Sequence, residues 1–185
     1  YDEDDVDAGR ADVDDLGLTA GDVLIAVAVS GRTPYTVACA DRAAAADADV
    51  IAVVSEPNSP LAAIAGVAIV VPVGDEVLRG STRLSAGTAH KVALDATTTV
   101  AMTLAGRVHG DLMIDVVAAN AKLHGRAVAI VAEIAGCDDV RARVALEDCG
   151  WNARAAVVRL VLGIDPDAAA ERAAAHRSLR DALSD

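Results

Sequence analysis

Apolar residues gather in short, unbroken runs in the first half of the chain. Such runs are typical of strands that are buried on both faces of a parallel sheet. Between them, helical stretches begin at Pro34 and Pro60, and proline is well tolerated in the first turn of a helix. The predicted strands cover residues 22–29, 50–54 and 67–72, and the predicted helices cover residues 1–18, 34–46 and 60–65. This alternation predicts an α/β fold with a parallel sheet.

The second half of the chain has a helical pattern throughout. A long Ala/Thr/Leu-rich helix is predicted at 82–104, after a glycine-bounded loop at 73–81. The other predicted helices cover residues 111–123, 126–135, 138–148 and 152–162, with a short terminal helix after Asp165-Pro166. Gly136 and Gly150 separate the last three as stop signals. We therefore expect a first domain at 1–124 and a small three-helix module of the ubiquitin-associated kind, with its terminal helix, at 125–185.

Composition restricts the possible partners. Hydrophobic residues make up 54% of the chain but aromatic residues only 2%, without any Phe, so Ala, Val, Leu and Ile must build the core. A formal net charge of -12 argues against nucleic acid and against an anionic membrane surface. A small phosphate-bearing molecule is still compatible, because helix N-termini can bind it locally. The three cysteines are scattered and odd in number, which favours a reducing cytoplasm.

The first candidate site is the segment Ser30-Gly31-Arg32-Thr33-Pro34-Tyr35, between a predicted strand and a predicted helix. Gly31 allows a ligand to approach the backbone, and the Ser30 and Thr33 hydroxyls lie beside the free N–H groups of a helix start. Ligands of open α/β sheets bind at such strand ends. An ordinary capped turn would have the same sequence, so phosphate binding and simple capping both remain open here.

The second candidate is the stretch 74–91, which begins as a loop and becomes a helix. Ser81 and Thr82 would lie near the helix start, and Glu76 could bind sugar hydroxyls. The alternative is a helix capped by Ser81, with Arg83 and Lys91 solvated. We expect Ser30, Thr33, Ser81 and Thr82 to line one anion pocket.

Together these stretches resemble the N-acetylmuramic acid 6-phosphate etherase and glucokinase regulatory protein family, whose signature has the form G-x-E-x-x-x-G-S-[ST]-R-x-K-x-x-x-x-x-K. Ser85 stands where this family usually has Lys, and His90 where etherases usually have Gln. The matching residues are Gly74, Glu76, Gly80, Ser81, Thr82, Arg83 and Lys91. The resemblance implies a three-layer, flavodoxin-like sugar isomerase (SIS) domain. Because the chain begins at Tyr1 rather than Met, we expect this domain to be incomplete at its N-terminus.

The resemblance also implies an activity. Etherases are carbon–oxygen lyases that cleave the D-lactyl ether of N-acetylmuramic acid 6-phosphate, yielding N-acetylglucosamine 6-phosphate and D-lactate in cell-wall sugar recycling. It places one of two catalytic carboxyls at Glu3, although a glutamate in an acidic run is usually solvated. The implied sugar-phosphate-binding residues are Ser30, Gly31, Arg32, Thr33, Glu76, Ser81, Thr82, Arg83 and Lys91. No metal or organic cofactor is implied, and a homodimer is expected. A non-catalytic sugar-phosphate sensor and an inactive fragment are the alternatives.

Overall fold

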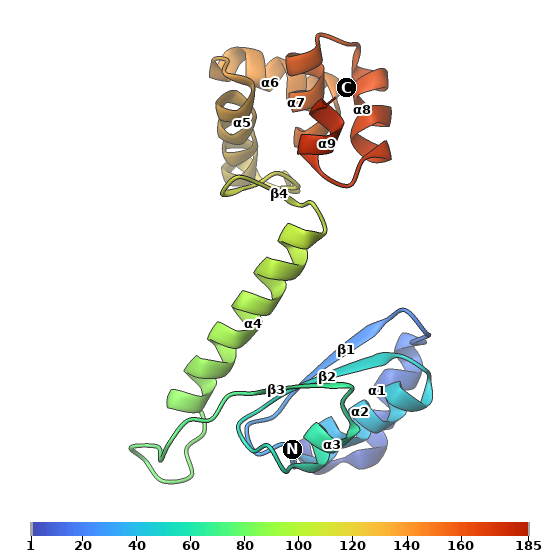
Figure 1. The fold of residues 1–185 in the computed structure, drawn as a ribbon, viewed down its shortest axis with the longest axis vertical. Coiled ribbons are helices and arrows are strands. Elements are labelled where there is room, and N and C mark those ends of the chain that lie inside the picture. The colour runs from blue at the N-terminus through green and yellow to red at the C-terminus, as the bar shows by residue number, and fades with distance from the viewer. Residues whose placement is uncertain (1, 185) are drawn as a thin grey trace. The chain divides into compact units, whose positions relative to one another are not determined.

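Three parallel strands form the sheet of the N-terminal half (Figure 1). In this computed structural model, which describes residues 2–184, they are β1 (Val23–Val27), β2 (Asp49–Val54) and β3 (Val67–Val70), paired in the order β1-β2-β3. The register aligns Ile25 with Ile51 and Ile51 with Val67. The predicted α/β fold with a parallel sheet is confirmed.

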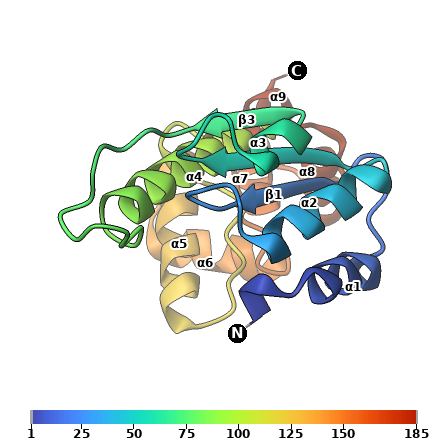
Figure 2. The ribbon, with the colours of Figure 1, turned by 90° about the horizontal axis from the view of Figure 1, so that it is seen from below.

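Helices cover one face of this sheet (Figure 2): α1 (Val6–Leu16), α2 (Pro34–Ala45) and α3 (Pro60–Ile64), preceded by the 3-10 turn η1 (Asp2–Asp4). Small side chains in the core allow close packing. A Cβ at Gly9 would lie 2.6 Å from the Tyr35 carbonyl oxygen, and the Cys39 thiol donates to the Gly9 carbonyl oxygen at 3.2 Å. The backbones of α1 and α2 therefore approach each other where an alanine would already collide.

The opposite face of the sheet is apolar and partly exposed. Val23, Ile25 and Val27 of β1 and Val67 of β3 are all exposed. Their Cβ atoms alternate with those of the strand residues that face α2, as the two-residue period of a strand requires. The N-terminal half of the chain thus presents an apolar sheet surface.

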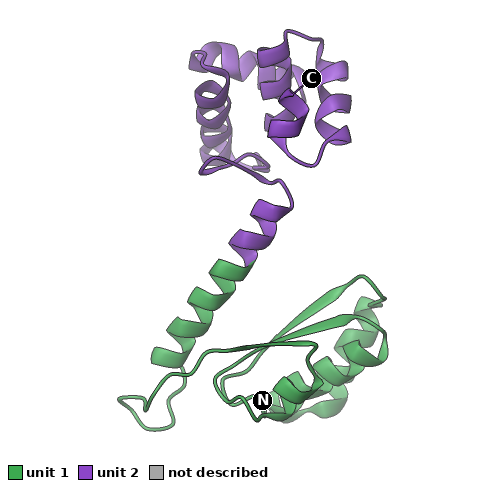
Figure 3. Ribbon diagram, in the orientation of Figure 1, with its two compact units in different colours: residues 1–97 green, residues 98–185 purple. Residues whose placement is uncertain are grey.

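The chain divides into two compact units, residues 1–97 and residues 98–185 (Figure 3). Helix α4 (Ser85–Leu104) is continuous across the point of division. The second unit continues with the hairpin of β4 (Val108–His109) and β5 (Leu112–Met113). Its helices are α5 (Ala121–Ala135), α6 (Asp139–Asp148), α7 (Ala153–Leu162), α8 (Pro166–Ala175) and α9 (Leu179–Leu183). The domain division after residue 124 stays a prediction.

Capping residues set the helix ends of unit 2. Gly136 ends α5 in the left-handed conformation at φ 63°, so the predicted stop after residue 135 is confirmed. The Asp138 side chain accepts from the Arg141 N–H at 2.8 Å and begins α6. Trp151 stacks on His124 with ring centroids 3.9 Å apart, which ties the start of α7 to α5.

The predicted helix at 111–123 is wrong. Gly110, at φ 62°, turns the chain into the β4–β5 hairpin, and the segment after β5 remains without regular structure up to Asn120. Ile114 and Val116 are buried two positions apart, a spacing of extended chain rather than of helix. Helix α5 begins only after Asn120, whose side chain accepts from the Leu123 N–H at 3.0 Å. Within residues 2–184, no helix combines the length and the apolar character that crossing a membrane requires.

Candidate functional site

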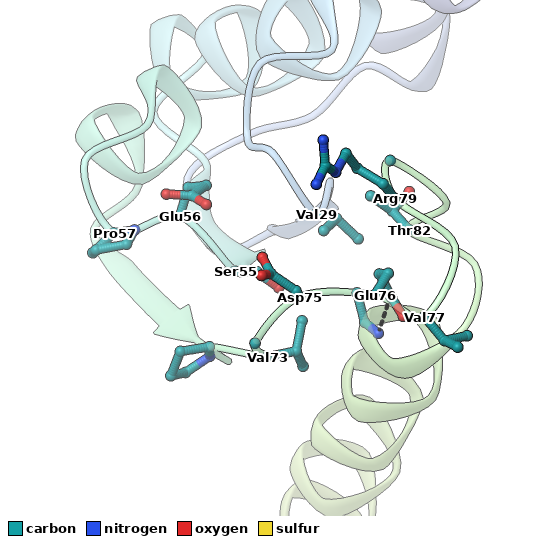
Figure 4. A pocket seen from close by; sticks show the side chains of 14 residues that line it. Val29, Ser55, Glu56, Pro57, Val73, Asp75, Glu76, Val77, Arg79 and Thr82 are labelled. Carbon is teal, nitrogen blue, oxygen red and sulfur yellow. Dashed lines mark hydrogen bonds between the residues drawn. The ribbon is translucent and has the colours of Figure 1, made fainter.

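A hollow of about 960 Å³ lies at the carboxyl ends of the three strands in unit 1 (Figure 4). Val29 borders it just beyond β1, Ser55 follows β2, and Pro72 and Val73 follow β3. The carboxyl ends of parallel strands meet at one edge, which is where open α/β sheets bind ligands. Glu56 and Pro57 after β2 and Ala86 of α4 also line it. The loop that leads into α4 contributes Gly74, Asp75, Glu76, Val77, Arg79, Gly80 and Thr82.

The hollow carries charges of both signs. Glu56, Asp75 and Glu76 supply carboxylates, and Arg79 supplies a guanidinium group, all drawn around the space in Figure 4. Carboxylates can accept from sugar hydroxyls, whereas a guanidinium group pairs with a phosphate through two parallel N–H bonds. The chemistry of this lining suits a ligand with hydroxyl groups and one anionic group.

Glu76 caps helix α4 from nine and ten residues away. Its carboxylate oxygens accept from the backbone N–H groups of Ser85 and Ala86, each at 2.9 Å. Both hydrogen bonds lower the pKa of Glu76 from its ordinary value of 4.5, and the bond from Ala86 has the larger effect. The charge also meets the positive end of the helix dipole. Glu76 therefore fixes the loop of the hollow to the start of α4.

The loop at 30–33 packs against the start of α3. Gly31 has φ 61°, and a Cβ there would lie 2.2 Å from the Ser59 hydroxyl oxygen, so this position requires glycine. The Gly31 carbonyl oxygen accepts from the Leu61 N–H at 3.1 Å. Ser30 is exposed, and its hydroxyl oxygen accepts from the Arg32 N–H at 3.3 Å. Close packing inside the protein accounts for the glycine without any ligand.

The structure brings the two predicted stretches to the same edge of the sheet, since Ser30 follows Val29 and both Gly80 and Thr82 line the hollow. Of the predicted binding residues, Glu76 and Thr82 line it directly. In the described chain, the others do not belong to its lining: Ser30, Gly31, Arg32, Thr33, Ser81, Arg83 and Lys91. Lys91 pairs with Asp95 on α4. The four-residue anion pocket stays a prediction.

Glu3 lies in η1, which contacts α2. Helix α2 starts directly after the 30–33 loop. Glu3 is exposed and, among the residues described, is not part of the lining of the hollow. Its catalytic role stays a prediction.

Sequence reasoning missed Ser55, Asp75, Arg79 and His90. Ser55 could have been found as the first polar residue after an apolar strand, and Asp75 and Arg79 as neighbours of matching signature positions. His90 is buried, with only 4% of it exposed. Its Nε2 lies 3.0 Å from the Ser55 hydroxyl oxygen, and burial lowers its pKa.

Comparison with known proteins assigns the chain to a family. Residues 6–100 match the family model of the SIS domain, so the chain belongs to the SIS domain family.

Curated relatives named N-acetylmuramic acid 6-phosphate etherase match nearly the whole chain. The relative from Aliivibrio fischeri (strain MJ11) is 42% identical over 184 residues, which are 99% of this chain and 61% of that relative. The relative from Rubrobacter xylanophilus is 43% identical over 183 residues, 99% of this chain and 60% of that relative. The resemblance carried by residues 74–91 is thus confirmed, and the chain spans about 60% of the length of these relatives.

The capping role of Glu76 predicts a pH dependence. Because its pKa is lower in the folded state, its stabilising contact is fully present above pH 4.5 and is lost as the pH falls through the folded-state pKa. We expect the amide proton shifts of Ser85 and Ala86 in NMR spectra to titrate together, with a midpoint below 4.5. The Glu76→Gln variant should abolish this titration.

The matched control is Glu56→Gln, which removes a carboxylate from the same hollow but leaves the cap intact. Titration of the two amide signals should persist in this control. If it also persists in Glu76→Gln, Glu76 does not cap α4 in solution.

Proposed function

We propose that this chain carries the sugar-phosphate-binding part of an N-acetylmuramic acid 6-phosphate etherase. The observation that carries the proposal is the match to etherases over 99% of the chain. The hollow supports it, because the loop that holds the signature residues also closes the carboxyl edge of the sheet.

The phosphate group is proposed to bind at the side of the hollow that contains Arg79 and Thr82. A guanidinium group and a hydroxyl group can both donate to phosphate oxygens. The 30–33 loop, with the start of α2 behind it, is the second proposed donor region, with Ser30 and Thr33 as its hydroxyls. Glu56 and Asp75, which also line the hollow, are proposed to accept from the sugar hydroxyls.

The proposed reaction uses two carboxyl groups in different protonation states. A carboxylate removes the proton from the carbon beside the sugar aldehyde carbon, and a carboxylic acid protonates the departing lactyl oxygen. Water then adds to the unsaturated sugar, so that N-acetylglucosamine 6-phosphate and D-lactate result. Two carboxyls with separate pKa values suit this division of labour. Glu3 is the proposed contributor of one of them.

A non-catalytic sugar-phosphate sensor is the second candidate. The observation that favours it is the position of Glu3, which is outside the described lining of the hollow. Such a protein would use the same binding residues without needing Glu3. Binding and turnover therefore have to be measured separately.

We also propose a reducing, cytoplasmic location. Its support is that all three cysteines are free thiols, Cys39 buried and both Cys137 and Cys149 partly buried. Proteins of oxidising compartments usually pair their cysteines.

The first prediction separates Arg79, which lines the hollow, from Arg83, which the signature singled out. Arg79→Ala should weaken binding of N-acetylmuramic acid 6-phosphate roughly tenfold or more, because a hydrogen-bonded charge partner of the phosphate is lost. Arg83→Ala is the matched variant, since both arginines are exposed and lie four residues apart. Isothermal titration calorimetry measures both. A larger loss in Arg83→Ala would place the phosphate outside the hollow.

The second prediction concerns turnover. Glu3→Gln should lower D-lactate release from N-acetylmuramic acid 6-phosphate by roughly 10²–10⁴-fold, the usual cost of losing a general acid or base. The neighbouring substitution Asp4→Asn is the control and should leave the rate unchanged. The same two substitutions are made at the aligned positions of the Aliivibrio fischeri relative. If D-lactate release is unimpaired both in this chain with Glu3→Gln and in the relative with the matching substitution, Glu3 has no part in the site and the sensor is favoured.

The third prediction is a homodimer. Its support is the exposed apolar sheet face of Val23, Ile25, Val27 and Val67, because apolar surface of this kind usually marks an interaction site. Sedimentation velocity should show a dimer, and Ile25→Glu should shift it toward the monomer. The control Val140→Glu changes an exposed valine on α6, outside this sheet face. A monomeric protein at all concentrations would contradict the proposal.

A further inference from the structure

Ser55 and His90 form the one contact at the hollow between a lining hydroxyl and a buried imidazole among the residues described. Ser55 follows β2 and lines the hollow, and His90 lies one turn and a half into α4. The His90 Nε2 and the Ser55 hydroxyl oxygen are 3.0 Å apart. The Ser55 N–H donates to the Val29 carbonyl oxygen at 2.9 Å, so the backbone of this serine is also held at the sheet edge. Its hydroxyl group therefore has a defined position.

The direction of the hydrogen bond depends on the imidazole tautomer. Nε2–H would donate to the Ser55 oxygen and leave the hydroxyl hydrogen of Ser55 free to point elsewhere. Nδ1–H would instead make Nε2 an acceptor, and the Ser55 hydrogen would then be used within the protein. The two tautomers thus present opposite hydrogen-bonding groups to the hollow.

The surroundings of His90 decide between the tautomers. Its Nδ1 is buried and has no hydrogen-bond partner within residues 2–184. A buried N–H without an acceptor is rarer in proteins than a buried acceptor without a donor. Burial also favours the neutral ring, since it penalises the charged form. These surroundings favour the tautomer in which Nδ1 has no proton and Nε2 carries it.

We propose that His90 is a positioning residue that donates its Nε2–H to Ser55 and so makes the Ser55 hydroxyl a hydrogen-bond donor into the hollow. The ligand group it serves is an oxygen that only accepts, such as a phosphate or carbonyl oxygen of the sugar phosphate. The identity of this ligand rests on the proposed function, whereas the tautomer does not. His90 itself does not line the hollow in the described structure and acts through Ser55.

Two substitutions of His90 differ in one relevant respect. Three bonds separate Cβ from Nε2 in both histidine and glutamine, so His90→Gln keeps a donor at the position that faces Ser55. The amide nitrogen of asparagine is only two bonds from Cβ, which matches Nδ1, so His90→Asn removes that donor while keeping a polar amide. A structural role of the buried ring alone would be impaired by both.

The binding experiment titrates N-acetylmuramic acid 6-phosphate into the full chain by calorimetry. Ser55→Ala and His90→Asn should each weaken binding by roughly tenfold, the effect of one hydrogen bond to a charged group. His90→Gln should bind like the unsubstituted chain. In the double variant Ser55→Ala/His90→Asn, the loss should not exceed that of Ser55→Ala, because the two residues act as one unit. Additive losses, or a His90→Gln variant as weak as His90→Asn, would overturn the proposal.

The tautomer is measured without ligand and without any substitution. Long-range ¹H–¹⁵N NMR spectra of the histidine-labelled chain should show His90 as the neutral Nε2–H form at pH 7. An Nδ1–H form would overturn the proposal even if the sugar phosphate binds. If the unsubstituted chain does not bind the sugar phosphate, the proposed function fails, and the tautomer still decides whether His90 donates to Ser55.

Discussion

The parallel pairing of β1, β2 and β3 is the constraint on which the rest of unit 1 depends. It aligns Ile25, Ile51 and Val67 across the sheet, and it sends the chain out of all three strands at the same edge. The loops after the strands must then lie together, although residues of the hollow are as far apart in sequence as Val29 and Thr82. An antiparallel strand would have carried its loop to the other edge and left the hollow open on that side.

Small side chains set a second constraint, which acts on the helices. Without phenylalanine, the core reaches interior packing density only if backbones approach closely. Gly9 allows this between α1 and α2, and Gly31 allows it between the loop after β1 and Ser59 at the start of α3. The 30–33 loop is therefore held by contacts of the fold itself. Its shape does not depend on a ligand, which suits a site that has to exist before the ligand arrives.

The loop between β3 and α4 is fixed at its far end by polar contacts. Glu76 binds the first N–H groups of α4, and His90 binds Ser55 just over one turn further along the same helix. Arg79, which lies between Glu76 and His90 in the sequence, provides positive charge at a hollow that is also lined by three carboxylates. The net charge of -12 does not oppose a proposed anion site at this hollow strongly, because hydrogen-bond donors act at short range and the field of distant charges is screened.

The amino-acid sequence by itself determined the parallel sheet, the glycine stop at Gly136 and the family. All of these depend on neighbouring residues or on a motif that is continuous in the chain. Only the tertiary structure decided that residues 112–113 form a strand, that Glu76 caps α4, that Arg79 rather than Arg83 lines the hollow, and that His90 reaches Ser55. These features depend on which way a loop turns and on contacts between residues up to 35 positions apart. Local sequence patterns carry no record of such contacts, because the chain brings these residues together only once the sheet and helices have packed.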